Sequence, residues 1–238
     1  MTTRTIADHV KRLDWTSLGD ALDAQGFATT GKLLDADTCS ALAALYEQPQ
    51  GFRSRVVMQR HGFGQGEYRY FERPLPATVQ LLRENIYPRL ARIANRWHTV
   101  LGVERRFPDS LDAWLKTCHD AGQTKPTPLL LKYQAGDYNC LHRDLYGELV
   151  FPLQLTVLLS DPDAGFAGGE FMLTEQRPRM QSRGHVVSLR QGEAVIFAVN
   201  ERPVKGTRGW YRTAMRHGVS TVRSGQRVTL GVIFHDAA

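Results

Sequence analysis

Apolar residues recur at helical spacing through the first part of the chain. This pattern predicts helices over residues 6–13, 15–25, 78–101 and 110–121. Gly26 is suited to end the second helix in a left-handed conformation. Asp35 or Asp37 can cap a further helix that runs to about residue 47. We therefore expect residues 1–125 to be mainly helical.

Two segments of this first part read as strands. Residues 53–58 alternate in the manner of a strand, and residues 67–71 read as a returning strand after a glycine-rich turn at residues 62–66. They predict a β-hairpin near residues 53–71. Residues 27–30 could form another short strand.

The pattern changes at Pro128. Short β-like runs separated by glycine and proline follow at residues 128–133, 151–159, 170–174, 193–197, 212–217 and 227–234. Many short strands after a helical start predict an α+β fold, a β-sandwich braced by N-terminal helices. A length of 238 residues fits one domain over residues 1–238, with the β core at residues 126–238.

Composition predicts a soluble cytoplasmic protein with no membrane partner. Hydrophobic residues make up 42% of the chain, enough for a sizeable core. No window approaches the ~20 apolar residues that span a bilayer, and residues 1–14 are too polar for a signal peptide. The three widely spaced cysteines indicate a reducing compartment and argue against a zinc knuckle. Cys140 lies two residues before His142, but it reads more readily as a small buried filler than as a residue close to a metal site.

The net charge of +6 is unevenly placed along the chain. Residues 201–227 contain one acidic and seven basic residues, and several arginines cluster with aromatic residues between residues 53 and 73. Residues 14–37 are acidic instead. Such asymmetry suggests a polyanionic partner. A solvated basic surface explains it equally well.

The candidate chemistry lies in a His-x-Asp triplet and a distant histidine. His142 and Asp144 are two residues apart, so both side chains point the same way from an extended segment and can hold one ion. His217 must then come from another strand. Two imidazoles and one carboxylate on one face of a metal leave the opposite face open, as in non-haem Fe(II) oxygenases.

A possible carboxylate site follows ten residues after His217. Arg227 and Thr229 alternate along a predicted strand and so face one side. A guanidinium beside a hydroxyl can bind a carboxylate through two parallel hydrogen bonds. A surface arginine is the alternative.

In this order the motifs resemble those of a 2-oxoglutarate- and Fe(II)-dependent dioxygenase, over residues 129–234. The Tyr133 to Tyr138 stretch before the triplet is similar to the Tyr-x-x-Gly of prolyl-hydroxylase-like members. Residues 133–151, 168–183 and 217–236 resemble a bacterial oxygenase family assigned to oxidative dealkylation of damaged nucleic acid. That closer resemblance covers nearly the whole chain.

The resemblance implies a double-stranded β-helix, a jelly-roll variant. It implies Fe(II) bound by His142, Asp144 and His217, and 2-oxoglutarate bound by Arg227 with hydroxyl donors from Thr229 and Tyr133. With O2 as the third reactant, the substrate would be hydroxylated with release of succinate and carbon dioxide.

The substrate is less constrained. The predicted hairpin could lie over the metal and stack on an alkylated base, single-stranded or flipped, while arginines hold phosphate, as DNA repair would require. The residues expected to contact substrate are Arg53, Arg55, Tyr68, Tyr70 and Arg216. The ten-residue spacing from His217 to Arg227 matches prolyl-hydroxylase-like enzymes better, so a hydroxylase of protein side chains or small metabolites is the alternative. A non-catalytic jelly-roll binding module is disfavoured because both sets of residues are present.

Overall fold

The computed structural model describes residues 3–162 and 164–238. Its helices lie mainly in the first half of the chain: α1 (Thr3–Arg12), α2 (Trp15–Gln25), α3 (Ala36–Ala44), α4 (Ala77–Val100) and α5 (Leu111–Asp120), with short 3-10 helices at Leu45–Glu47 and Met58–His61. All of the helices predicted from the sequence are confirmed, within a few residues at their ends.

The strands are β1 (Phe27–Lys32), β2 (Phe52–Val57), β3 (Gly64–Gln65), β4 (Glu67–Phe71), β5 (Leu129–Gln134), β6 (Tyr138–His142), β7 (Leu153–Leu158), β8 (Phe166–Gly168), β9 (Phe171–Gln176), β10 (Arg183–Val187), β11 (Glu193–Ala198), β12 (Glu201–Gly206), β13 (Gly209–Val219) and β14 (Val222–Val232). In the described residues they form two sheets. The larger has the order β1-β11-β7-β14-β5-β4-β2, with β8 paired to β14, and the smaller has the order β10-β9-β13-β6-β3, with β12 paired to β13.

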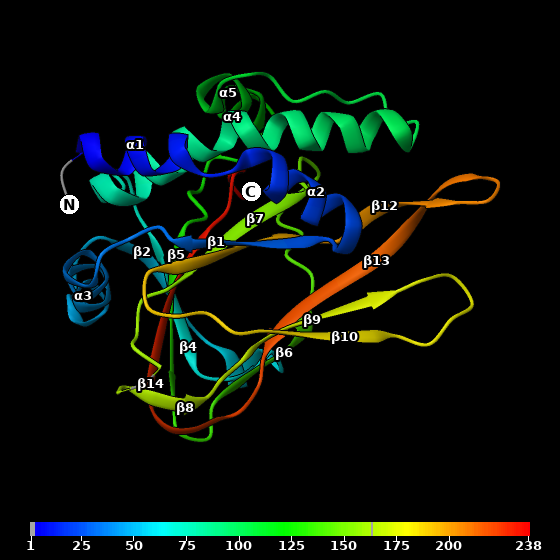
Figure 1. Ribbon diagram of the computed structural model, residues 1–238. Coiled ribbons are helices and arrows are strands. Elements are labelled where there is room, and N and C mark those ends of the chain that lie inside the picture. The colour runs from blue at the N-terminus through cyan, green and yellow to red at the C-terminus, as the bar shows by residue number, and fades with distance from the viewer. Residues whose placement is uncertain (1–2, 163) are drawn as a thin grey trace.

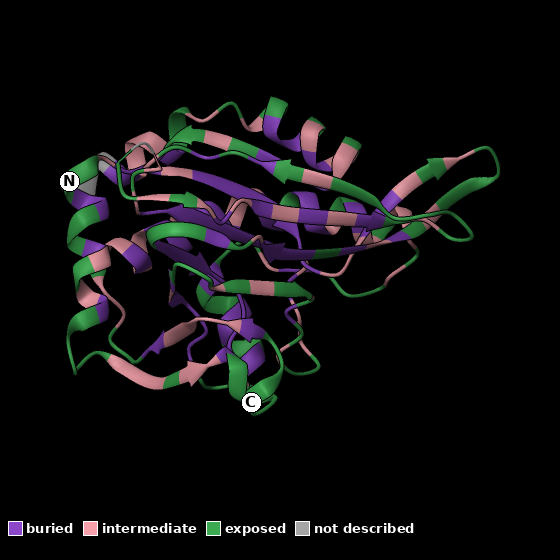
Figure 2. Cartoon of the chain, turned by 90° about the horizontal axis from the view of Figure 1, so that it is seen from below, coloured by how far each residue is buried: buried purple, intermediate pink, exposed green. Residues whose placement is uncertain are grey.

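Helices and sheets form separate layers. Figure 1 shows α1, α4 and α5 together above the larger sheet, and the smaller sheet on its other side. Every residue of β7 is buried, and most of β11 is buried as well. Figure 2 shows this buried interior, from which a long hairpin extends with mostly exposed and half-buried residues. The expected α+β class, with N-terminal helices bracing a β core, is confirmed.

Local sequence explains the helix ends. The Asp14 carboxylate accepts hydrogen bonds from the backbone N–H groups of Thr16 and Ser17 at the start of α2. Gly26 ends that helix with φ of 82°, and its N–H bonds to the Leu22 carbonyl. Asp35 caps α3 in the same way as Asp14 caps α2.

The strands that the sequence did not predict have identifiable reasons. β6 has exposed or half-buried residues throughout, so it lacks the apolar alternation of a half-buried strand. β10 is an edge strand with mostly exposed residues, and β12 contains Pro203. Pairing rather than side-chain pattern therefore defines these strands. The strand expected at residues 227–234 begins earlier, at Val222, and ends at Val232.

The first half of the chain also contributes to the sheets. β1 pairs with β11, and β4 of the predicted hairpin pairs with both β2 and β5. The hairpin near residues 53–71 is confirmed, and it extends the larger sheet. None of the helices in the described residues is long and apolar enough to cross a membrane.

A buried ionic network fastens the end of the chain to α4. The fully buried Arg83 donates to the carbonyls of Ile233 and His235 and to the Asp236 carboxylate, at 2.8, 3.1 and 2.8 Å. His119 Nε2 lies 2.8 Å from the same carboxylate. These contacts hold the segment after β14 beneath the helices.

Candidate metal centre

The structure brings the three predicted metal ligands together. His142 Nε2 lies 3.3 Å from Asp144 Oδ1, and His217 Nε2 lies 3.3 Å from Asp144 Oδ2. One ligand atom from each residue lies within 4.8 Å of the others. Adjacent ligands held about 2.1 Å from one ion are about 3 Å apart, so this spacing suits a metal better than a close hydrogen bond.

Sheet register explains why residues 75 positions apart meet. His142 at the end of β6 is directly paired with His217 in β13, and their ring centroids are 4.2 Å apart. His142 Nδ1 lies 2.8 Å from the Cys140 carbonyl. Since a carbonyl only accepts, Nδ1 carries the proton, and the Nε2 lone pair is free to bind a metal.

Asp144 lies just after β6, in a segment held by two further side chains. Its Oδ1 accepts a 2.8 Å hydrogen bond from the Tyr146 hydroxyl. The buried Gln123 donates to the carbonyls of Tyr146 and Leu149 and accepts from the Leu149 N–H. Gln123 also donates to the Asp236 carbonyl, which joins this segment to the C-terminal network.

The Asp144 carboxylate is ionised. Burial would raise its pKa, but the two imidazoles beside it outweigh burial and hold the pKa well below its usual range. An acceptor-only carboxylate beside two imidazoles is the donor set expected for a facial Fe(II) site.

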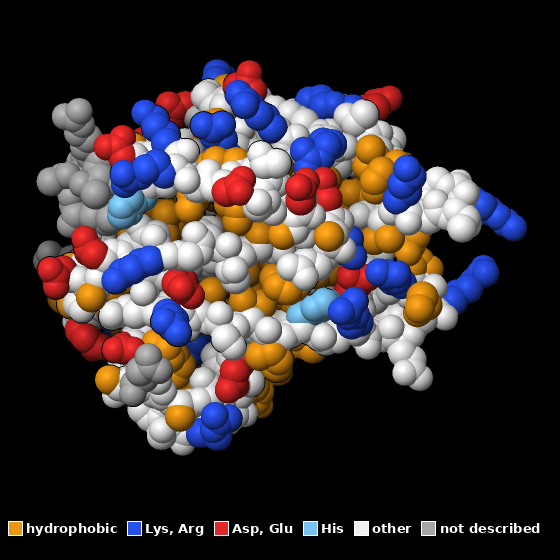
Figure 3. Space-filling model, viewed as in Figure 1, with side chains coloured by type: hydrophobic (Ala, Val, Ile, Leu, Met, Phe, Trp, Pro, Cys, Tyr) orange, Lys and Arg blue, Asp and Glu red, His pale blue; other side chains and the backbone are white. Residues whose placement is uncertain are grey.

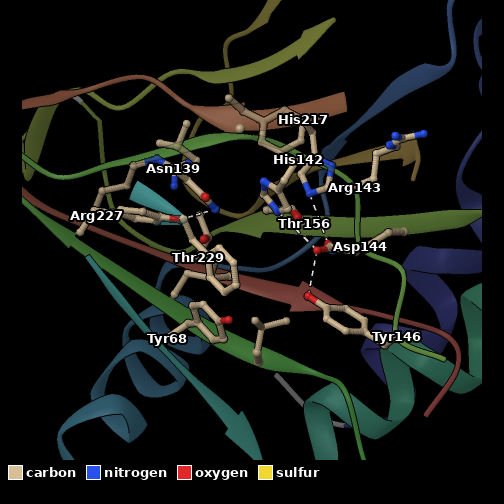
Figure 4. A pocket seen from close by; sticks show the side chains of 18 of the residues that line it. Tyr68, Asn139, His142, Arg143, Asp144, Tyr146, Thr156, His217, Arg227 and Thr229 are labelled. Carbon is tan, nitrogen blue, oxygen red and sulfur yellow. Dashed lines mark hydrogen bonds and ion pairs between the residues drawn. The ribbon is translucent and has the colours of Figure 1, made fainter. Parts of the chain in front are cut away.

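A cavity of about 210 Å³ opens beside these residues. Figure 4 shows the His142, Asp144 and His217 side chains at one side of it, with Arg227, Thr229 and Asn139 at the other. Arg227 is 2% exposed, and its Nη1 has no hydrogen-bond partner among the described residues. A buried cation without a hydrogen-bonding anion is costly, so this end of the cavity is suited to an anionic ligand.

The predicted carboxylate-binding residues share this end. Arg227 and Tyr133 are register partners on β14 and β5, and the guanidinium lies 5.6 Å from the Tyr133 ring centroid. Thr229 is also buried and lines the cavity. Burial lowers the pKa of Arg227 to about 10, which leaves it charged at neutral pH.

The five residues expected to contact substrate are placed less favourably. Only Tyr68 lines the cavity. Arg53 donates to the Pro126 carbonyl and lies over the buried Tyr70 ring, and Arg55 pairs with Glu67 on the hairpin surface. Arg216 is exposed on β13, facing away from its neighbour His217. The structure does not bring these four to the cavity.

The hairpin tip nevertheless borders the cavity. Phe63 lines it and is 48% exposed, and the Phe63 carbonyl accepts a 2.9 Å bond from the Cys140 N–H. Cys140 itself is exposed, so the expectation of a buried filler was wrong. It lies in β6, where a register irregularity between the pairs at His217 and Val219 interrupts strand alternation.

Sequence reasoning missed several residues of the site. Tyr146 and Gln123 carry no motif, because their roles depend on a segment folding back beneath β14. Gln154 and Thr156 line the cavity from β7, where the apolar run around them predicted only a core strand. The two-residue spacing from Asp144 to Tyr146 was the single available signal.

Residues 66–237 match the model of the Oxygenase-NA family, described as an oxygenase catalysing oxidative methylation of damaged DNA. An uncharacterized protein of Mycobacterium tuberculosis is 54% identical over 168 residues, which cover 71% of this chain and 72% of that protein.

Solved structures share the fold at low sequence identity. A prolyl hydroxylase of Trichoplax adhaerens superposes with a TM-score of 0.59 and 12% identity, over 97% of this chain and 92% of its own. A 2OG-Fe(II) oxygenase-family oxidoreductase of Burkholderia pseudomallei superposes with a TM-score of 0.54 and 16% identity, over 95% of this chain and 94% of its own. A Pseudomonas putida prolyl-4-hydroxylase superposes with a TM-score of 0.53 and 16% identity, over 91% of this chain and 96% of its own. These likenesses confirm the predicted double-stranded β-helix fold.

Proposed function

The chain belongs to the Oxygenase-NA family of 2OG-Fe(II) oxygenases, and from that premise we propose that it oxidatively removes alkyl groups from damaged nucleic acid. The observation that carries the proposal is a three-residue metal-binding cluster that faces, across one cavity, a buried arginine whose Nη1 has no hydrogen-bond partner in the described residues. Membership in the family supplies the substrate class.

The residues fit the implied metal and cosubstrate. His142, Asp144 and His217 would hold Fe(II), with the proton on His142 Nδ1 fixed by the Cys140 carbonyl. Arg227 would bind the distal carboxylate of 2-oxoglutarate, with Thr229 and Tyr133 as hydroxyl partners. When bound, iron with 2-oxoglutarate and O2 supplies an oxidant that hydroxylates a C–H bond.

Oxidation of an N-methyl group leads to loss of the methyl group from the base, not to methylation of it. Replacing one C–H bond of N–CH3 by C–OH gives N–CH2OH, whose C–N bond then breaks to release formaldehyde and leave N–H. The family description speaks of oxidative methylation of damaged DNA. Chemistry of an oxidising centre of this kind makes demethylation the consistent outcome.

The cavity walls suit a base taken out of its stack. Tyr68, Leu131 and Phe171 supply aromatic and aliphatic surface. Asn139 and Gln154, whose Oε1 accepts no hydrogen bond from the described part of the chain, supply polar groups. A flipped base is bound through stacking and a few hydrogen bonds to its edge. Enclosure would exclude water from the reacting carbon.

The direct test measures two products with one enzyme preparation. Protein loaded with Fe(II), 2-oxoglutarate and O2 is incubated with methylated or unmethylated oligonucleotides, and formaldehyde and succinate are both quantified. We expect formaldehyde only with methylated oligonucleotides, in step with succinate. Succinate formation that no oligonucleotide alters would overturn the nucleic-acid proposal while leaving the oxygenase chemistry intact.

A hydroxylase of protein side chains or small metabolites is the second candidate. The ten-residue spacing from His217 to Arg227 favours it, because that spacing is typical of prolyl-hydroxylase-like enzymes. Such an enzyme would form succinate with a peptide or metabolite substrate and release no formaldehyde from oligonucleotides.

A further inference from the structure

Two basic hairpins extend side by side from the smaller sheet. One consists of β9 and β10 with the turn between them, and the other of β12 and β13 with theirs; we call them the hairpin arms. β9 pairs with β13, so the arms are neighbouring extensions of one sheet. Figure 3 shows Lys and Arg side chains projecting from the end of each arm.

The positive charge of the whole chain is concentrated there. The arms, residues 171–187 and 201–219, carry eight basic and two acidic residues, which leaves 22 basic and 22 acidic residues elsewhere. The acidic side chains of the arms form ion pairs with three of these cations: Glu175 pairs with Arg177 and Arg202, and Glu201 pairs with Arg212. A net charge of +6 is thus a local property of the arms.

Several of these cations have no acidic partner. Arg179, Arg183, Lys205 and Arg208 are exposed and form no ion pair within the described part of the chain. Beside them Trp210 is 46% exposed and Met180 60% exposed. Unpaired cations interleaved with an exposed indole are the combination that binds phosphates and stacks on bases in single-stranded nucleic acid.

The base of one arm adjoins the cavity. Arg143 lines the cavity and donates a 2.9 Å hydrogen bond to Asn200, immediately before β12. Trp210 and His217 lie on the same continuous strand, β13. Seven residues at about 3.3 Å each separate them by about 23 Å, about seven steps of a DNA strand at 3.4 Å per step.

We propose that the hairpin arms bind the sugar-phosphate backbone of a nucleic-acid strand several nucleotides away from the base in the cavity. This inference rests on the proposed function and adds where the strand is held. The arms would contribute affinity without reading sequence, because phosphate contacts position a strand and base contacts specify it. Binding through the arms would therefore require flanking nucleotides.

The test compares two matched charge-reversal variants. Arg179→Glu/Arg208→Glu changes one exposed cation on each arm, and Lys11→Glu/Arg12→Glu changes two exposed cations on α1. Affinity for a fluorescent, unmethylated 20-nucleotide single strand is measured by anisotropy at several salt concentrations. Circular dichroism melting verifies that both variants are folded.

We expect the arm variant to bind at least ten-fold more weakly and the α1 variant to bind much as the wild type does. The slope of log affinity against log salt should fall by about 1.4 in the arm variant, because each lost phosphate contact removes about 0.7. Equal affinities of the two variants would overturn the proposal. If polyglutamate bound as tightly as the oligonucleotide, the proposal would also be overturned, and an acidic protein would be the partner of the arms.

Turnover separates this inference from the proposed function. With a methylated trinucleotide, too short to reach the arms, the arm variant should release formaldehyde as fast as the wild type. With a methylated 20-nucleotide strand, its KM should rise. If formaldehyde release depended neither on the length of the strand nor on the charge of the arms, the role of the arms would be overturned and the proposed function would stand. If the arm charges affected binding but no methylated strand released formaldehyde, the proposed function would be overturned and the role of the arms would stand.

Discussion

The Tyr146 hydroxyl donates a 2.8 Å hydrogen bond to Oδ1 of Asp144, the one carboxylate among the three candidate metal ligands. Tyr146 is itself held through its carbonyl by Gln123, and its ring lies near His235. The orientation of Asp144 is thus set from outside the metal centre. Hydrogen bonds to metal-binding side chains typically affect metal affinity by 10- to 100-fold.

Tyr146→Phe should weaken metal binding with little loss of fold stability. Removing the hydroxyl leaves Asp144 free to rotate, and the lost hydrogen bond is worth only about 1 kcal/mol to folding. We expect Co(II) or Fe(II) affinity to fall about ten-fold or more by titration calorimetry. Tyr87→Phe removes a buried hydroxyl that has no partner in the described residues and serves as the matched control. Equal affinities of the two variants would contradict the positioning role.

Gln123→Met should destabilise the protein and loosen the Asp144 segment together. The methionine fills similar space but leaves three carbonyls and one N–H without their partner. A buried group left unsatisfied costs about 1–3 kcal/mol, so four such groups should lower the free energy of unfolding in urea by at least about 4 kcal/mol. Gln191→Met loses a single bond to the Leu159 carbonyl and should lose much less.

Arg227→Met should abolish tight 2-oxoglutarate binding without unfolding the protein. The charged hydrogen bonds it would make to a carboxylate are worth about 1.5–3 kcal/mol each, so affinity should fall ten-fold to a hundred-fold or more. Thermal stability without cosubstrate should hold or rise, because the substitution removes a buried guanidinium that has no acidic partner in residues 3–162 and 164–238.

Arg223→Met is the control for that experiment, since Arg223 is an exposed arginine on the same strand. Calorimetric titration of 2-oxoglutarate in the presence of Mn(II) provides the affinity. A dissociation constant in the Arg227 variant equal to that of the Arg223 variant would remove Arg227 from the site.

His235 should make the protein sensitive to mild acid. Burial lowers its pKa to about 4, and its Nδ1 accepts a hydrogen bond from the Phe151 N–H. The unfolded state, with a pKa near 6.5, takes up the proton first as pH falls. The free energy of unfolding therefore contains the full contribution of His235 above about pH 6.5. It falls by roughly 3 kcal/mol as the pH is lowered toward 4.

His235→Asn retains an acceptor for the Phe151 N–H but does not titrate. We expect its unfolding free energy to vary less than that of the wild type between pH 6.5 and 4 in urea titrations. The other histidines are common to both proteins, so the difference isolates His235. Parallel curves across that range would show that His235 is not buried as a neutral group.

Sequence alone was sufficient for the elements whose pattern is local. The helices follow from apolar periodicity and caps such as Asp14 and Gly26, and the candidate ligands follow from the His-x-Asp spacing with a later histidine. Apart from the distant His217, each of these signals is contained in a few neighbouring residues.

Features that depend on tertiary pairing could not be predicted in that way. β6 has no apolar alternation, yet pairing with β13 sets His142 opposite His217. Gln123 reaches the Asp144 segment only because the chain turns back after α5. Arg53 and Arg55 have suitable chemistry, but their partners, the Pro126 carbonyl and Glu67, were not visible in the sequence.

The most direct test of the account is the stoichiometry of ferrous iron binding under anaerobic conditions. The wild type should bind one Fe(II) per chain, and addition of 2-oxoglutarate should produce a visible charge-transfer absorption band. His217→Ala, with folding verified by circular dichroism, should bind iron far more weakly and show no such band. Iron binding by His217→Ala as tight as that of the wild type, or no binding by the wild type, would contradict the account.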